Sequence, residues 1–382
     1  MKTKIFAMLA ALSIATIGIT SCGGGGGSTS TGTQVASKGV VTGFGSVFVN
    51  GVKYDTTSSG IIIDDSSVTV DSLKVGMVVK VKGILNDDGV TGSASSIEYE
   101  DSLEGPVANL TATGFSVLGQ NVVVTATTVF DGVANLAALT NGQVVEVSGL
   151  SNPDGSITAT RIEVKSSTEY KVRGTVSNLG ASTFTLTVTP TLAFTVNHAN
   201  ATIVPSPAAL VNGAFVKVKA TTAPIGTTIT ATKVAVKQSG FEDSARAEIE
   251  GMVANFNSTL KTFTINGITV NAFGITLPAG FGDGTRVEVK GPFSNGVLSA
   301  AKLEMEKDSD QDVQGTVSAK TATTLTVNGI VITVTATTMY EDSSSRHDRM
   351  FSFASIAVND TVEVKGYLEN ISSLIATRIE RK

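Results

Sequence analysis

Few side chains in this sequence have a type and spacing that could support catalysis or metal binding. The 382 residues include two histidines, His198 and His347, and one cysteine, Cys22. Zinc sites need several converging histidine or cysteine ligands, and nucleophilic catalysis needs a nucleophile beside a base. Asp348 follows His347, but neighbouring residues of a strand face opposite ways. We therefore expect both histidines to be solvated loop residues and the protein not to be an enzyme.

An acidic run offers a weak metal-binding pattern. Asp308, Asp310 and Asp312 alternate with polar residues, and such carboxylates can gather oxygen ligands around calcium. An EF-hand loop would need glycine and glutamate where Val313 and Ala319 stand. A solvated acidic linker is the simpler interpretation, so we expect no cofactor, and calcium remains a hypothesis. Other acidic stretches that calcium could stiffen contain Glu98, Glu100, Asp101, Glu242 and Asp243.

The amino-terminal residues have the pattern of an export signal. Lys2 and Lys4 precede an apolar run, 5–19, that is shorter than the ~20 residues needed to span a bilayer. The four residues ending at Cys22 resemble a bacterial lipobox. The resemblance implies that residues 1–21 are a removable signal peptide and that Cys22 is acylated. An ordinary cleaved signal with an incidental thiol is the alternative.

Acylation of Cys22 would determine where the protein is held. Several acyl chains on one residue anchor a protein stably to a membrane. Gly23 stands where lipoproteins of the inner membrane usually carry aspartate, which indicates the outer membrane, on its periplasmic or surface face, if the host has two membranes. Residues 22–37 are rich in glycine, serine and threonine, so we expect a flexible tether with a reach of about 20–25 Å.

Beyond the tether, one pattern recurs five times at intervals of about 70 residues, the size of a small domain. Each block opens on Gly-x-Val and continues to a large apolar residue, which a turn residue follows three positions later. Val-x-Val comes next, and the block closes on Ala-x-x-aliphatic. The turn residue of the fifth block is asparagine, which tolerates a left-handed backbone best after glycine, so this position is expected to have a positive φ. The turn residues are Gly76, Gly142, Gly213, Gly284 and Asn359.

The alternation within each block predicts β-strands. After Gly284, two valines face one way while Arg286, Glu288 and Lys290 face the other, which is the period of a half-buried strand. About five strands per block suit a small closed barrel. The predicted fold is therefore all-β: five tandem small antiparallel β-barrels of the OB-like kind. Hairpin turns are expected at the Asn-Gly or Asp-Gly pairs that begin with Asn50, Asp88, Asp154, Asn266, Asn295 and Asn328.

The blocks also set the expected domain boundaries. A unit this small buries only about 60% of its unfolded surface, so neighbouring repeats are expected to lean on one another. Repeats 1 to 5 are assigned to residues 38–101, 102–169, 170–241, 242–307 and 308–382.

The repeat pattern resembles the bacterial domain-of-unknown-function 5666 family, which occurs as tandem copies in envelope lipoproteins. The resemblance rests on the Gly-x-Val opening, the Leu-x-x-Gly-x-x-Val-x-Val-x-Gly segment and the Ala-x-x-Ile-Glu ending. Repeat 3 departs most, with Ala220 and Ala235 where the other repeats have glycine and, usually, glutamate. The family brings no established activity, so no functional residue carries over.

Composition narrows the choice of partners and functions. The net charge falls from −5 to −7 once Lys2 and Lys4 are removed, and it is spread without a basic face, so we expect no nucleic-acid partner. No tryptophan is present to form an evident sugar-binding platform.

The favoured function is a non-catalytic envelope scaffold, spacer or protein-binding and adhesive module. Its expected partners are the membrane, through the lipid anchor, and another envelope protein or a glycan. The alternative is a ligand-binding protein that holds a small molecule or oligosaccharide at its barrel mouths. The insert 341–353 of repeat 5 is the best location for such a site. The oligomeric state stays open.

Overall fold

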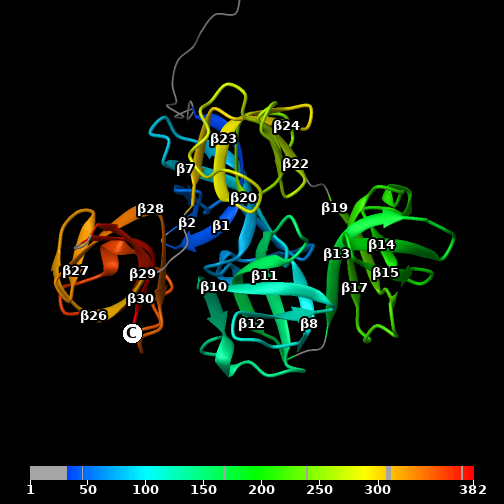
Figure 1. Ribbon diagram of the computed structural model, residues 1–382, viewed down its shortest axis with the longest axis horizontal. Coiled ribbons are helices and arrows are strands. Elements are labelled where there is room, and N and C mark those ends of the chain that lie inside the picture. The colour runs from blue at the N-terminus through cyan, green and yellow to red at the C-terminus, as the bar shows by residue number, and fades with distance from the viewer. Residues whose placement is uncertain (1–31, 45, 167–168, 238–239, 307–310, 371–372) are drawn as a thin grey trace, which may run out of the picture. The chain divides into compact units, whose positions relative to one another are not determined.

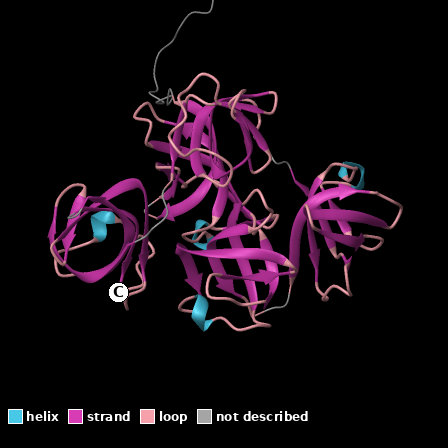
Figure 2. Ribbon diagram, in the orientation of Figure 1, coloured by secondary structure: helices cyan, strands magenta, loops and turns pink. Residues whose placement is uncertain are grey.

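The computed structural model describes residues 32–44, 46–166, 169–237, 240–306, 311–370 and 373–382. Small β-barrels follow one another along this part of the chain (Figure 1). Its only helical elements are four short 3-10 turns (Figure 2). The predicted all-β fold of five tandem barrel repeats is confirmed.

Repeat 5 shows the circuit of strands most simply. Its strands close a ring in the order β26, β27, β28, β30, β29, and neighbours are antiparallel except for the parallel pair β28 and β30. In chain order this is 1-2-3-5-4 with a parallel contact between the third and fifth strands, the Greek-key order of an OB barrel. The bounds are β26 (Gln311–Lys320), β27 (Thr324–Val327), β28 (Ile330–Asp342), β29 (Thr361–Asn370) and β30 (Ser373–Arg381).

Repeats 2 and 4 close the same circuit. In both, the first strand pairs with the second and with the fourth. The strands of repeat 2 are β8 (Leu103–Ala108), β9 (Gly114–Val117), β10 (Gln120–Asp131), β11 (Val144–Ser151) and β12 (Ile157–Val164). Those of repeat 4 are β20 (Ser244–Asn257), β21 (Thr262–Ile265), β22 (Ile268–Asn271), β23 (Arg286–Ser294), β24 (Val297–Ser299) and β25 (Lys302–Met305).

Repeats 1 and 3 follow the circuit with interrupted strands. In repeat 1 two segments, β3 and β4, share the parallel contact with β7. Its strands are β1 (Thr33–Gly43), β2 (Val47–Val49), β3 (Val52–Asp55), β4 (Gly60–Ile63), β5 (Ser66–Val68), β6 (Val78–Leu85) and β7 (Thr91–Tyr99). Those of repeat 3 are β13 (Tyr170–Ser177), β14 (Thr183–Thr189), β15 (Leu192–Asn197), β16 (Thr202–Val204), β17 (Phe215–Ala220), β18 (Thr228–Thr230) and β19 (Lys233–Lys237).

The first strand begins earlier than the tether prediction allowed. β1 starts at Thr33, and residues 33–40 pair with residues 78–85 of β6. Val35 and Ser37 are both buried. Residues 33–37 therefore belong to the first barrel, and the expected end of the tether at residue 37 is wrong. The Ser- and Thr-rich composition concealed the strand because its buried face carries small side chains.

The recurring turn residue has the predicted backbone conformation. Asn359 has φ 78°, close to the 83–89° of the four glycines at the same position. Positive φ at both residues of Asn50-Gly51 and Asn266-Gly267 is what a type I′ hairpin requires.

The glycine after Val-x-Val is required by a close approach of two strands. A Cβ on Gly366 would lie 2.1 Å from the carbonyl oxygen of Ile375, and a β-bulge follows Lys365. Repeat 3 tolerates Ala220 at this position because β17 ends there and pairs with β19 but not with β18.

The closing alanine accepts a hydrogen bond that recurs in several repeats. The third strand kinks before it reaches the fifth, and a hydroxyl of the kink donates a hydrogen bond to the alanine carbonyl. In repeat 5, Thr338 Oγ1 lies 2.8 Å from the oxygen of Ala376. Repeats 1 and 2 repeat the contact through Ser59 to Ala94 and Thr128 to Ala159, both at 2.7 Å.

The barrels are filled by apolar side chains. Both valines of every Val-x-Val segment are fully buried, as the alternation predicts. In repeat 5 these are Val362 and Val364, which pack with Leu325, Ile332 and Phe351. Burying small branched side chains in this way stabilises each barrel.

Candidate functional site

The two histidines have different environments. His347 is exposed in a loop with φ 44°, as expected. His198 is buried, and its ring centroid lies 5.5 Å from that of Phe184. The expectation that His198 is solvated is therefore wrong, because the ring packs over the barrel of repeat 3.

The calcium candidate is only partly placed. Asp308 and Asp310 lie outside the described residues, as does Cys22. Asp312 opens β26, is exposed, and its Oδ2 lies 3.9 Å from Nζ of Lys365. An exposed pair at this distance contributes little to stability.

The acidic stretch after repeat 1 is not a solvated linker. Asp101 is completely buried, and its carboxylate contacts Lys171, with Oδ2 to Nζ at 3.0 Å, and also Lys217. Glu100 pairs with Arg173 and Lys237. These cations belong to repeat 3, so the stretch joins repeats 1 and 3 through buried charges.

We call the buried charged residues at this point the lysine–carboxylate cluster. They come from the turn between β4 and β5, from β8, β11, β13 and β17, and from the linker between repeats 1 and 2. Lys171 Nζ lies 2.6 Å from an oxygen of Asp64 and 2.6 Å from one of Glu104. Glu146 accepts a hydrogen bond of 2.9 Å from the Tyr99 hydroxyl. The members are Asp64, Asp101, Glu104, Glu146, Lys171 and Lys217.

The electrostatics of the cluster keep both kinds of charge in place. Burial alone would raise the pKa of Asp64, but Lys217 and Lys171 outweigh it and hold that pKa well below its usual range. Burial would lower the pKa of Lys171, but Asp101 and Asp64 raise it far above its usual value. Burial raises the pKa of Glu104. The cluster is an ionic joint whose carboxylates depend on the lysines.

Three carboxylates of the cluster are close enough to hold a cation. One oxygen each from Asp64, Asp101 and Glu146 lies within 4.8 Å of the others. The Lys171 ammonium already lies 2.6 Å and 3.0 Å from oxygens of Asp64 and Asp101. Because this ammonium supplies the positive charge that a metal would bring, the arrangement fits a structural joint better than a metal centre.

Repeat 1 is joined to repeat 4 through the backbone. Residues 35–38 of β1 pair in parallel with residues 246–249 of β20, so one sheet runs through both barrels. The backbone amide of Val40 also donates to Glu250, at 3.1 Å. A shared sheet of this kind fixes the register between the two repeats.

Repeat 1 is joined to repeat 2 by side chains of β11 and β12. The hydroxyl of Thr160 donates to the carbonyl of Gly76 at 2.6 Å, and the amide of Val78 donates to Ser148 Oγ at 2.9 Å. Gly76 is therefore a turn of one barrel and a docking point for the next.

The insert 341–353 joins repeat 5 to repeat 1. Its Arg349 donates to the carbonyls of Leu73, at 3.0 Å, and Val70, and contacts Asp71. The guanidinium also lies 4.6 Å from the ring centroid of Phe44. The sequence marked this insert as a place for a specialised site, and the structure gives it a docking contact.

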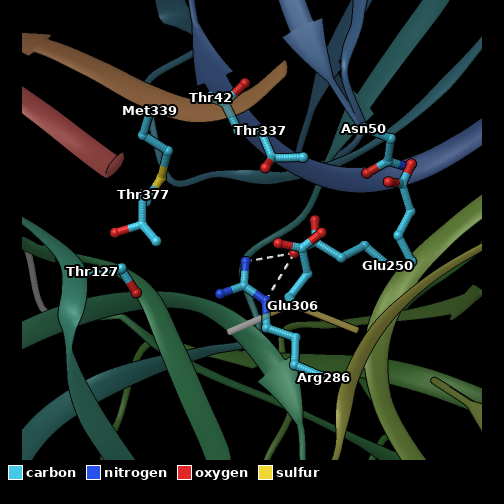
Figure 3. Close-up of a pocket in the computed structure, with 10 residues that line it drawn as sticks. Thr42, Asn50, Thr127, Glu250, Arg286, Glu306, Thr337, Met339 and Thr377 are labelled. Atoms are coloured by element: carbon cyan, nitrogen blue, oxygen red, sulfur yellow. Dashed lines mark hydrogen bonds and ion pairs between the residues drawn. The ribbon is translucent and has the colours of Figure 1, made fainter. Parts of the chain in front are cut away.

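Two hollows between repeats are lined mostly by polar residues. We call the first, of about 30 Å³, the four-repeat cavity because residues of repeats 1, 2, 4 and 5 line it (Figure 3). The second, of about 160 Å³, lies between turns of repeats 2 and 3, and its polar groups bond one another: Gln120 Nε2 donates to the Gly155 carbonyl at 2.8 Å and Ser156 Oγ to Asp154 at 2.7 Å. The four-repeat cavity is lined by Thr42, Asn50, Thr127, Glu250, Arg286, Glu288, Glu306, Thr337, Met339 and Thr377.

Comparison with protein-family models places all five repeats in one family. The domain of unknown function DUF5666 matches residues 38–98, 104–163, 173–235, 250–304 and 314–380. The chain belongs to the DUF5666 family. Repeat 3 matches as well, so the Ala220 and Ala235 substitutions leave a recognisable DUF5666 unit. No curated protein matches the chain. Among the described residues of this DUF5666 protein, no helix has the length and apolar character needed to cross a bilayer.

The sequence missed the residues that join the DUF5666 repeats. Glu146, Lys217 and Glu288 each stand between the two valines of a Val-x-Val segment, on the face assigned to solvent. The alternation was correct, but the outward face is buried against another repeat. The change of charge at this one position from repeat to repeat was the available signal, because it suits partners of opposite charge.

Proposed function

We propose that this protein is a non-catalytic, lipid-anchored scaffold of the bacterial envelope, in which repeats 2 to 5 are docked on repeat 1. The observation that carries the proposal is that repeat 1 has specific polar contacts with every other repeat. Charge pairs, a shared sheet and the Arg349 contact each require a fixed geometry. A preassembled scaffold presents its loops at fixed spacings, which a string of independent domains does not.

The filled barrels support the scaffold over ligand storage. A ligand-binding barrel needs an open interior with a few polar groups, and pockets of this kind usually measure about 300–1,000 Å³. Apolar side chains fill the described barrels, and the two hollows described above are smaller than such pockets and lie between repeats.

The polar hollow between repeats 2 and 3 is what supports the alternative, a glycan-binding module. Its lining of amides, hydroxyls and one carboxylate suits a sugar, although its groups already bond one another. Titrating the purified full chain with envelope glycans separates the two functions. Asn121 lines this hollow. Saturable glycan binding that Asn121→Ala abolishes would favour the glycan-binding module. A lack of glycan binding would favour the scaffold.

The anchor is the second part of the proposal. With β1 starting at Thr33, residues 22–32 would form a tether with a reach of roughly 18 Å, shorter than the sequence alone suggested. Gly23 supports the outer membrane as the destination in a host with two membranes. Acidic linkers around 308–312 would add calcium-dependent stiffness, which scattering with calcium and with chelator would test.

Cys22→Ser tests the anchor directly. The unchanged protein should partition with membranes and incorporate labelled fatty acid, whereas the variant should be soluble and unlabelled. Thr33→Ser, a matched change at the start of β1, should behave as the unchanged protein. Equal membrane partitioning of Cys22→Ser and the unchanged protein would refute lipid anchoring at this residue.

A further inference from the structure

The four-repeat cavity encloses more carboxylates than its space can hydrate. Glu250, Glu288 and Glu306 line it together with one described cation, Arg286. Its volume of about 30 Å³ admits one or two water molecules. Two or three ionised carboxylates would need far more water than that, or a matching set of cations.

One of the three carboxylates is neutralised within the cavity. Glu250 accepts a hydrogen bond of 2.9 Å from Nε of Arg286 (Figure 3). It accepts another of 3.1 Å from the amide of Val40. The Arg286 guanidinium balances the charge of Glu250. Glu288 is 4% exposed, and its Oε1 lies 2.9 Å from Nζ of Lys290, which also donates to the Asn50 carbonyl of repeat 1 at 3.2 Å.

The rest of the lining is four hydroxyls, the Asn50 amide and the Met339 thioether, all from the other repeats. Thr42 comes from β1, Thr127 from β10, Thr337 from β28 and Thr377 from β30. Hydroxyls can accept from a protonated carboxyl, but they bring no positive charge to balance an ionised one. The three neighbouring repeats therefore face repeat 4 with groups that suit neutral carboxyls.

We propose that the four-repeat cavity is a proton-operated joint, closed while Glu288 and Glu306 carry protons and opened to water when both ionise. Opening separates the threonines of repeats 2 and 5 from repeat 4, while the pairing of β1 with β20 keeps repeat 1 in place. This inference concerns the chain's own assembly and is independent of the proposed lipid anchor.

The electrostatics agree with the geometry. Burial raises the pKa of Glu288 to about 7, and Glu248 and Glu250 raise it further while Lys290 opposes them. Burial likewise raises the pKa of Glu306 to about 7, with Glu250 and Glu304 adding to the rise and Arg286 and Lys290 opposing it.

Two tyrosines of other repeats complete the charged and titratable surroundings. Tyr54 of repeat 1 is influenced by Glu288 and Glu248, and Tyr367 of repeat 5 by Glu306. Both tyrosine pKa values are raised by burial, so neither hydroxyl ionises near neutral pH. Neither therefore adds a negative charge to the cavity between pH 5.5 and 8.

The direction of the pH effect follows from the raised pKa values. In an unfolded or opened chain each carboxyl returns toward its ordinary value of 4.5. The closed joint therefore has its full stabilisation below pH 4.5 and loses it as the pH rises through about 7. Between pH 5.5 and 8, each carboxyl should shift the closed-to-open equilibrium about 25-fold toward the open form.

The experiment compares thermal unfolding and hydrogen exchange of the full chain at pH 5.5 and 8, at constant ionic strength. We expect a lower Tm at pH 8. We also expect at least tenfold faster exchange, corrected for intrinsic rates, in β10 and β28. Glu288→Gln with Glu306→Gln should remove both effects. Asp87→Asn, which removes an exposed carboxylate from a turn of repeat 1, should keep the unchanged protein's behaviour.

A flat profile of the unchanged protein between pH 5.5 and 8 would overturn the proposal without any variant. So would a double glutamine variant that keeps the pH dependence. If that variant fails to fold, Glu306→Gln alone should remove about half of the shift in Tm. Calcium added at pH 8 should not restore the closed exchange pattern of β10, and a return to that pattern would make the cavity a cation site instead.

Discussion

Replacing Lys171 with methionine removes the central cation of the lysine–carboxylate cluster and keeps most of the side chain's apolar stem. Lys171 is 5% exposed and its ammonium lies 2.6 Å from Glu104, 2.6 Å from Asp64 and 3.0 Å from Asp101. Lys217 still contacts Asp64 and Asp101 in the variant, so Glu104 loses the most.

Two free-energy costs set the expected loss of stability in Lys171→Met. Removing one partner of a buried ion pair typically costs about 3–5 kcal/mol. Glu104 can escape part of that cost by taking up a proton, which from its ordinary pKa of 4.5 costs about 3.4 kcal/mol at pH 7. We therefore expect Lys171→Met to lower the free energy of unfolding by about 3 kcal/mol at pH 7.

The stability lost in Lys171→Met should depend on pH. The loss of Lys171 raises the pKa of Glu104 further, so the folded variant binds a proton that the unfolded chain does not. The deficit should shrink as the pH falls, to below about 1 kcal/mol at pH 5. Urea unfolding followed by far-ultraviolet circular dichroism measures both values.

Lys219→Met is the matched control. Lys219 lies on β17, and its pair with Glu169, at 2.6 Å, is about one third exposed, so its loss should cost no more than about 1 kcal/mol. Equal urea midpoints for Lys171→Met and Lys219→Met, or a deficit that does not change with pH, would refute the reasoning.

Three further predictions concern the docking contacts and the repeat motif. Arg349→Ala should increase hydrogen exchange in the insert 341–353 and in the turn around Leu73. It should weaken the contact between repeats 5 and 1 by about 2 kcal/mol, because charge-assisted hydrogen bonds are lost. Unchanged exchange would count against a docking role. Gly291→Ala should destabilise repeat 4 by about 1–3 kcal/mol, since its Cβ would meet a carbonyl oxygen at 1.9 Å, whereas Gly282→Ala has open space and should be neutral in the same thermal melt. Asn359→Ala should lower stability by about 1–2 kcal/mol because φ is 78°, and Asn359→Gly should not; equal melting of the two would refute the role assigned to the backbone angle.

The repeating barrel was accessible from the sequence because its signals are local. A positive φ needs glycine or asparagine, so Asn359 at the position of Gly284 identified the turn. The period of two placed Val287 and Val289 in a barrel core. These features depend on backbone sterics and on one strand at a time.

The joints between repeats were not accessible in the same way. Lys217 and Asp64 are 153 residues apart and approach only because two barrels dock, and neither has an unusual neighbour in the sequence. His198 was misjudged for a related reason: its polar sequence context suggested a loop, but the ring packs on Phe184. When two separately folded units make contact through their surfaces, the charge of the contacting residues is the only sign of that contact in the sequence.

The central claim is that the repeats form one assembly on repeat 1, and cross-linking β1 to β20 tests it most directly. Ala36 and Ala247 are partners in the parallel pairing, and neighbouring strands bring Cα atoms within the 4.4–6.8 Å range of a disulfide. In the Cys22→Ser background, Ala36→Cys with Ala247→Cys should oxidise within one chain and migrate faster on a non-reducing gel. Ala36→Cys with Lys82→Cys, partners inside the first barrel, is the positive control. If the control pair oxidises and the Ala36–Ala247 pair stays reduced, repeats 1 and 4 are independent and the assembly does not exist.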